Sequence, residues 1–197
     1  MKILAFVDLH GSRKALDIIL AKAKQADLIA CAGDLTIFGA DLDGILFELN
    51  KLKKPVLIIH GNHEMEDDLR KVSSLFDNTQ FIHNKIFYFN ECLFFGYGSG
   101  GFANNDPNLS KVSEKIKNKI REFAGKKILV THPPPYNTNA DVLLKEHCGN
   151  KTIAKFIKEM NFDLAICGHF HENAGAEGKI GRTLVINPGH NGKILEV

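Results

Sequence analysis

The sequence has few cysteines and no long apolar run. No run approaches the roughly 20 residues that a membrane-spanning helix needs, so no membrane partner is expected. The chain has 4 cysteines, which form no CxxC pair, namely Cys31, Cys92, Cys148 and Cys167. All but Cys148 lie in or beside apolar runs, where a free cysteine packs as a small hydrophobic side chain. A disulfide framework is therefore not expected in a chain of this size, and a cytoplasmic location is predicted.

A strong charge of either sign is also missing. The chain has 25 basic and 23 acidic residues, which give a net charge of +2. Proteins that bind nucleic acid usually carry a clear excess of basic residues, so a nucleic-acid partner is not expected. The net charge does not exclude a local basic patch. The hydrophobic fraction of 44% and the 197 residues suit one globular domain over residues 1–197 with a full core.

Short apolar runs rich in β-branched residues and bounded by turn residues predict buried strands. These runs are residues 2–7, 28–31, 56–59, 127–131 and 164–167. Asp8 and His10 interrupt the first apolar run, so it predicts a strand and not a signal peptide. Helical periodicity is present at residues 15–24, 42–52, 110–123 and 151–160, and more weakly at 67–76. The alternation of strands and helices favours βαβ units and an α/β sandwich.

The remaining segments have other patterns. Residues 81–97 are rich in Phe, Tyr and Ile and are broken near residues 84 and 90, which predicts short antiparallel strands. Residues 98–108 form a predicted Gly- and Asn-rich loop, and the three prolines within residues 132–139 exclude a regular helix or a central strand. Residues 183–186 and 193–197 predict two further strands joined by a loop.

Polar side chains follow all the predicted buried strands. The motifs are Asp8 and His10, Gly33–Asp34, Gly61–Asn62–His63–Glu64, His132, and Gly168–His169–Phe170–His171. Open α/β sheets bind ligands beyond the carboxyl ends of their strands. Imidazole, carboxylate and amide oxygen suit zinc or another transition metal, and the set contains no thiolate. Each motif alone is common and is more often structural, but together, at the same position of successive strands, they predict a metal site.

In this order the motifs resemble the signature of the calcineurin-like metallophosphoesterase superfamily, which runs D-x-H, GD, GNH[DE], a later His, and GHxH. The segment Asn187–Pro188–Gly189 is similar to a closing loop of small members. The resemblance implies a four-layer αββα sandwich, with two mixed sheets flanked by helices and the metal site at the carboxyl ends of the strands. One position departs from the pattern, since many members have GDxxD and this chain has Gly33-Asp34-Leu35-Thr36-Ile37. That second acid is not a metal ligand in the family, so the implied metal site is retained.

The resemblance also implies a hydrolase with two divalent metal ions, of which Mn, Fe, Zn, Ni and Co are the candidates. The first ion would be held by Asp8, His10 and His171, the second by Asn62, His132 and His169, and Asp34 would bridge the two. His63 would be the catalytic residue beside the ions, as an acid or as a donor to the transition state. The expected substrate is a phosphate-ester small molecule or a nucleotide, with a phosphodiester or phosphomonoester bond attacked by a hydroxide that bridges the ions.

Two alternatives stay open. The first is a protein-binding scaffold of the same fold without catalysis; such relatives usually lack ligands, especially the His of GNH, whereas this chain has all of them. The second is a nuclease, against which the balanced charge and the lack of an obvious extra domain argue.

The residues outside the main motifs have weaker signals. His60 is predicted to pack or to support a metal ligand, and His190 is a candidate to approach the site because it follows the Asn187–Pro188–Gly189 turn. His83 and His147 have no motif partner and are predicted to lie at the surface or in loops. Glu64 is predicted to brace the loop that carries His63.

Overall fold

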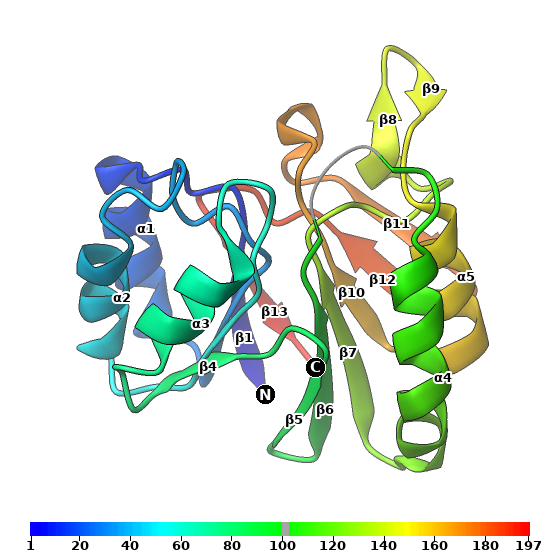
Figure 1. The fold of residues 1–197 in the computed structure, drawn as a ribbon, viewed down its shortest axis with the longest axis horizontal. Helices are drawn as coiled ribbons and strands as arrows, with labels where there is room; N and C mark the ends of the chain where they lie inside the picture. The colour runs from blue at the N-terminus through cyan, green and yellow to red at the C-terminus, as the bar shows by residue number, and fades with distance from the viewer. Residues whose placement is uncertain (100–102) are drawn as a thin grey trace.

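The computed structural model describes residues 1–99 and 103–197. Two β-sheets face each other, and each is covered on its outer face by helices, as Figure 1 shows. The predicted α/β fold, a four-layer αββα sandwich of two mixed sheets flanked by helices, is confirmed. Within the described part of the chain, no helix is long and apolar enough to cross a membrane.

The first sheet has the strand order β13-β1-β2-β3-β4. Four strands are parallel, namely β1 (Lys2–Phe6), β2 (Leu28–Cys31), β3 (Val56–Ile58) and β4 (Thr79–Phe81). The C-terminal strand β13 (Lys193–Glu196) runs antiparallel to β1. The helices α1 (Arg13–Ala23), α2 (Leu42–Asn50) and α3 (Glu66–Ser73) connect the parallel strands and cover the outer face.

The second sheet has the order β11-β12-β10-β7-β6-β5. Its central strands are parallel, namely β6 (Cys92–Tyr97), β7 (Lys126–Thr131), β10 (Leu164–Ile166) and β12 (Thr183–Ile186). The edge strands β5 (Lys85–Phe89) and β11 (Glu177–Ile180) are antiparallel to their neighbours. The helices α4 (Pro107–Glu122) and α5 (Lys151–Met160) cover this sheet, and a small hairpin of β8 (Val142–Leu143) and β9 (Glu146–His147) projects beyond it (Figure 1).

The central strands of both sheets are mostly apolar because both of their faces are buried. In β1, Leu4 and Phe6 face the helices, whereas Ile3 and Ala5 face the second sheet, as the two-residue period of a strand requires. A third apolar layer lies between the second sheet and α4 and α5. Parallel strands covered on both sides are expected to be continuously apolar, which is why the sequence pattern located them.

Some segments differ from the sequence-based expectation. The helix expected from residue 110 begins at Pro107, since the Asp106 side chain accepts hydrogen bonds from the backbone N–H groups of Asn108 and Leu109. The loop expected over 98–108 is shorter as a result, and residues 100–102 of it lie outside the described residues. Antiparallel pairing is confirmed for β5 and β6, but it was wrong for Phe81, which ends β4 parallel to β3.

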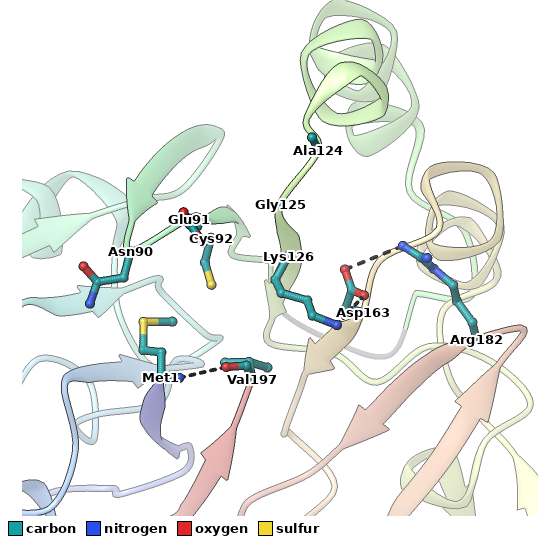
Figure 2. Close-up of a pocket in the computed structure, with 10 residues that line it drawn as sticks. All are labelled: Met1, Asn90, Glu91, Cys92, Ala124, Gly125, Lys126, Asp163, Arg182 and Val197. Atoms are coloured by element: carbon teal, nitrogen blue, oxygen red, sulfur yellow. Dashed lines mark hydrogen bonds and ion pairs between the residues drawn. The ribbon is translucent and has the colours of Figure 1, made fainter.

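Both chain termini lie at the edge of the sandwich away from the carboxyl ends of the parallel strands. There the Met1 ammonium donates a hydrogen bond of 2.8 Å to the Val197 carbonyl oxygen. A cavity of about 480 Å³ opens there, and Figure 2 shows the residues that line it. Its main charged side chains neutralise each other, because Lys126 and Arg182 both pair with Asp163. The cavity lies where β6 and β7 begin, away from the strand ends that carry the predicted metal ligands.

Candidate metal centre

The eight residues predicted for the site meet at the carboxyl edge of the two sheets. The first sheet supplies the loops after β1, β2 and β3, and the second sheet supplies the loops after β7 and β10. Two groups of side chains have their potential ligand atoms within 4.8 Å of one another, namely Asp8, His10 and His171, and Asp34, His132 and His169. The amide oxygen of Asn62 lies 3.0 Å from Nε2 of His132, so it adjoins the second group.

Asp34 lies between these two groups. Its Oδ2 is 3.8 Å from Nε2 of His10 in one group and 3.3 Å from Nε2 of His132 in the other. Its Oδ1 accepts a hydrogen bond of 2.9 Å from the backbone N–H of His63. A carboxylate with one oxygen facing both groups has the position that a bridging ligand needs.

The backbone is strained at four of the predicted ligands. The φ angles are 55° at Asp8, 48° at His10, 52° at Asp34 and 70° at His169, all in the left-handed region. Each such residue costs about 1–3 kcal/mol, and strain of this kind concentrates at functional sites. Neighbouring loops hold the conformation, since the Asp8 N–H donates to the Gly33 carbonyl oxygen and the His10 N–H to that of Asp34.

Hydrogen bonding fixes the ring of His132, which is fully buried. Its Nδ1 donates to the carbonyl oxygen of Ala32 at 2.9 Å, so Nε2 faces Asn62 and Asp34. Burial alone would lower the pKa of His132, but the hydrogen bond and charge of Asp34 raise it. Burial would likewise raise the pKa of Asp34, whereas the hydrogen bond and charge of His132 lower it to about 2. Each of the two groups therefore favours the charged form of the other, and a metal ion on Nε2 of His132 would replace a proton there.

For two of the other imidazoles, His10 and His169, the surroundings favour the neutral ring. Burial lowers the pKa of His10, and burial together with the charge of His132 lowers that of His169 to about 4. Neutral imidazole is the form that binds metals. Nε2 of His10 is also 3.0 Å from Nε2 of His171, so two ring nitrogens converge on one position. Carboxylates, imidazoles and an amide oxygen around one space fit first-row divalent metals.

His63 lies beside the two groups. Its ring centroid is 4.8 Å from that of His10, and its ligand atom is within 4.8 Å of those of His10 and Asp34. Its Nδ1 is buried and has no hydrogen-bond partner among the described residues. On its other side the ring of Phe38, which is 82% exposed, packs at 4.9 Å. No motif in the sequence predicted that the exposed Phe38 would lie beside His63.

Glu64 joins two of the strand-end loops, as predicted for a brace. Its buried carboxylate accepts hydrogen bonds from the backbone N–H groups of Asp34, Thr36 and Gly61, at 2.8–3.2 Å, and from the hydroxyl of Thr36 at 3.0 Å. Thr36 stands in the segment that lacks the second acid of GDxxD, and the structure gives it this supporting role.

We expect Glu64→Gln to lower the free energy of unfolding by about 2 kcal/mol or more, because an amide NH₂ cannot accept from the buried donors that it would face. Denaturant unfolding of the metal-free protein measures this loss separately from any effect on metal binding. The matched control is Glu122→Gln at an exposed position near the end of α4, which should change stability by less than about 0.5 kcal/mol. Equal stability of both variants would remove Glu64 as a brace.

The remaining predictions had mixed outcomes. The Nδ1 of His60 donates to the Gly61 carbonyl oxygen at 3.0 Å, which supports the loop before Asn62. His147 lies at the surface in β9, as expected, and contacts Asp141. His83 lies in the connection between β4 and β5, which agrees with the predicted loop position. It does not lie at the surface, because its side chain is 8% exposed and accepts a hydrogen bond from the Gly98 N–H.

The closing segment Asn187–Pro188–Gly189 after β12 is buried, and His190, which follows it, is exposed. The Asn187 side chain donates to the carbonyl oxygen of Phe170, and the Gly189 carbonyl oxygen accepts from the Val7 N–H. The segment thus supports the loops after β1 and β10. His190 itself is exposed, and its approach to the site stays a prediction.

Known proteins resemble this chain in sequence and in fold. The family model described as calcineurin-like phosphoesterase matches residues 1–173. An uncharacterized protein of Methanocaldococcus jannaschii is 35% identical over 95% of this chain and 88% of its own length. A crystal structure from Thermus thermophilus has a TM-score of 0.81 at 20% identity, covering 98% of this chain and 93% of that one. A dimetal phosphatase from Danio rerio has a TM-score of 0.66 at 10% identity, covering 94% and 86%. The family match over most of the chain and the 35% identity lead to one conclusion: this protein belongs to the calcineurin-like phosphoesterase family.

Proposed function

We propose that this chain, a metal-dependent phosphoesterase by family, hydrolyses phosphomonoester or phosphodiester bonds at a centre of two divalent metal ions. The observation that carries this proposal is the position of Asp34, whose Oδ2 faces His10 on one side and His132 on the other. The complete set of predicted ligands and the presence of His63 favour an enzyme over a scaffold of the same fold.

The residues would divide the work as follows. Asp8, His10 and His171 would hold one ion, Asn62, His132 and His169 would hold the other, and the Asp34 carboxylate would contribute to both sites. The ions, when bound, neutralise the phosphate oxygens and lower the pKa of a water. His63 donates a proton or a hydrogen bond to the oxygens of the substrate, and Glu64 keeps the loops of Asp34 and His63 in register.

The site is open to solvent, which suits a small phosphate ester or a nucleotide. Asn62 is exposed, and the side chain of His171 is 59% exposed. Mn, Fe, Zn, Ni and Co all accept this set of ligands, so the donor atoms do not select one of these metals. The single domain over residues 1–197 and the cytoplasmic location predicted from the cysteines belong to the same proposal.

Metal removal tests the proposal directly. We expect about two metal ions per chain in the purified protein, and chelation should abolish hydrolysis of p-nitrophenyl phosphate and bis(p-nitrophenyl) phosphate. Addition of Mn or a similar ion to the stripped protein should restore it. Metal analysis and a panel of phosphoester and single-stranded DNA substrates provide the measurements.

A protein that took up no metal under conditions that load other metalloproteins would favour the scaffold. Activity confined to DNA would favour the nuclease.

A further inference from the structure

A second cavity shares a loop with the candidate metal centre. It has a volume of about 520 Å³ and lies at the same carboxyl edge of the sheets, where β3, β4 and β6 end and α4 begins. A volume of this size is typical of a site for a small organic molecule. His60 forms part of its wall and precedes Asn62 by two residues, so one loop borders both the cavity and the centre.

Two hydrogen-bond acceptors face each other in this cavity. Nε2 of His60 and Oε2 of Glu66 are 4.0 Å apart. His60 uses its Nδ1–H on the Gly61 carbonyl oxygen, so the neutral ring has a lone pair on Nε2, and this buried atom has no hydrogen-bond partner among the described residues. Glu66 pairs with Arg70 through Oε1, which leaves Oε2 for the cavity. A buried acceptor without a donor, as Nε2 of His60 is, destabilises the fold unless a ligand or water donates to it, whereas the Glu66 side chain is 38% exposed.

A metal ion does not fit these acceptors well, although His83 completes a group of two imidazoles and one carboxylate. The Gly98 N–H donates to Nδ1 of His83 at 2.8 Å, so Nε2 of the neutral ring carries the proton. Burial, and then the proximity of His60, lowers the pKa of His83 to about 4, which keeps that ring neutral. A metal would need a lone pair where His83 has an N–H.

The N–H of His83 is a donor in the same group. Its Nε2 is 3.7 Å from Oε2 of Glu66 and 2.5 Å from Nδ2 of the Asn84 amide. With the proton on Nε2, this contact requires the amide oxygen of Asn84 in the place of Nδ2. Lys111 and Lys115 also line the cavity and form no ion pair among the described residues, whereas the Asp106 carboxylate accepts from Tyr97 and from the first N–H groups of α4. The two ammonium groups disfavour a cationic ligand. The part of the ligand beside Glu66 and His60 therefore carries no positive charge and offers hydrogen-bond donors. Hydroxyl groups have both properties.

We propose that this cavity binds the sugar part of a sugar phosphate monoester. Adjacent hydroxyl groups of the sugar donate hydrogen bonds to Glu66 and His60. The phosphate of the same molecule then lies at the metal centre. This inference rests on the proposed function and names its substrate class.

Two primary alkyl phosphates with similar leaving groups test it. We expect kcat/KM to be at least tenfold higher for ribose 5-phosphate than for n-butyl phosphate, because hydrogen bonds to a charged acceptor are worth about tenfold or more each. In Glu66→Gln this ratio should fall about tenfold, since the acceptor loses its charge. The control is Asp68→Asn, an exposed acid in the same helix α3, which should keep the ratio of the wild-type protein.

The outcomes separate this inference from the proposed function. No hydrolysis of either p-nitrophenyl phosphate or bis(p-nitrophenyl) phosphate by the metal-loaded protein overturns both, and hydrolysis of the diester alone overturns only the monoester inference. Hydrolysis of p-nitrophenyl phosphate with equal kcat/KM for the two alkyl phosphates overturns the sugar site alone, and this comparison needs no variant. An unchanged ratio in Glu66→Gln would also overturn the sugar site. So would a third metal ion per chain in the wild-type protein that Glu66→Gln lacks, because the cavity would then bind a metal.

Discussion

His63→Ala should keep nearly full metal content and lose turnover on alkyl phosphate esters by about two orders of magnitude or more. The structure explains why metal binding and turnover should respond differently to this substitution. The contact that His63 makes with Asp34 is through its backbone N–H, which alanine also has. The imidazole lies beside His10, and although its ligand atom is within 4.8 Å of those of His10 and Asp34, it belongs to neither of the two groups assigned to the ions. Removing the ring therefore removes a donor to the substrate without removing a ligand.

The leaving group decides which role His63 has. An alkoxide needs a proton to leave, whereas p-nitrophenolate scarcely does, so general-acid catalysis predicts a smaller loss for p-nitrophenyl esters. Equal losses on both would favour electrostatic stabilisation of the phosphoryl oxygens. Metal analysis beside single-turnover rates provides the measurement. Loss of metal in His63→Ala would make this residue a ligand, and unchanged turnover would remove it from the mechanism.

Asp34→Asn should weaken both metal sites at once. The carboxylate is 1% exposed and faces His10 and His132, and an amide in its place keeps the shape but loses the charge that holds two cations together. The loss of turnover should exceed the 10- to 100-fold that typically follows removal of a group that only orients a ligand. Total metal per chain and turnover at saturating metal are the measurements.

Two terminal ligands serve as comparisons for Asp34. We expect His171→Ala to lose chiefly the first metal ion and Asn62→Ala chiefly the second, because each belongs to one group only. Retention of both ions and of near-normal turnover by Asp34→Asn would show that Asp34 does not bridge.

The sequence predicted the elements whose pattern comes from burial. Residues 28–31 and 151–160 agree with β2 and α5 at both ends, because their apolar faces are set by the two-sided core. It missed β11, whose Glu177, Gly178 and Lys179 have low strand propensity and lie at a sheet edge, where backbone pairing alone defines the strand. The dipeptide Asp106–Pro107 is a helix start that sequence reasoning could have used.

The site divides in the same way. The strand-end pattern identified the side chains that converge, since parallel strands end at one edge of a sheet. It did not identify what depends on distances across the chain, such as the burial of His83 beside His60 and Glu66. His83 follows β4, which the sequence did not predict as part of the first sheet, so nothing in the sequence placed it near the loop after β3.

The ligands come from both sheets, and this has a consequence for folding. Asp8 and His10 follow a strand of the first sheet, and His169 and His171 follow a strand of the second, so bound ions would tie the open edge of the sandwich together. Only the folded chain brings these side chains together, and each ion then adds RT ln(1 + [M]/Kd) to the stability, about 2.7 kcal/mol at a free concentration of 100 Kd. How long the folded protein persists in a cell would then depend on the local supply of metal, quite apart from any substrate.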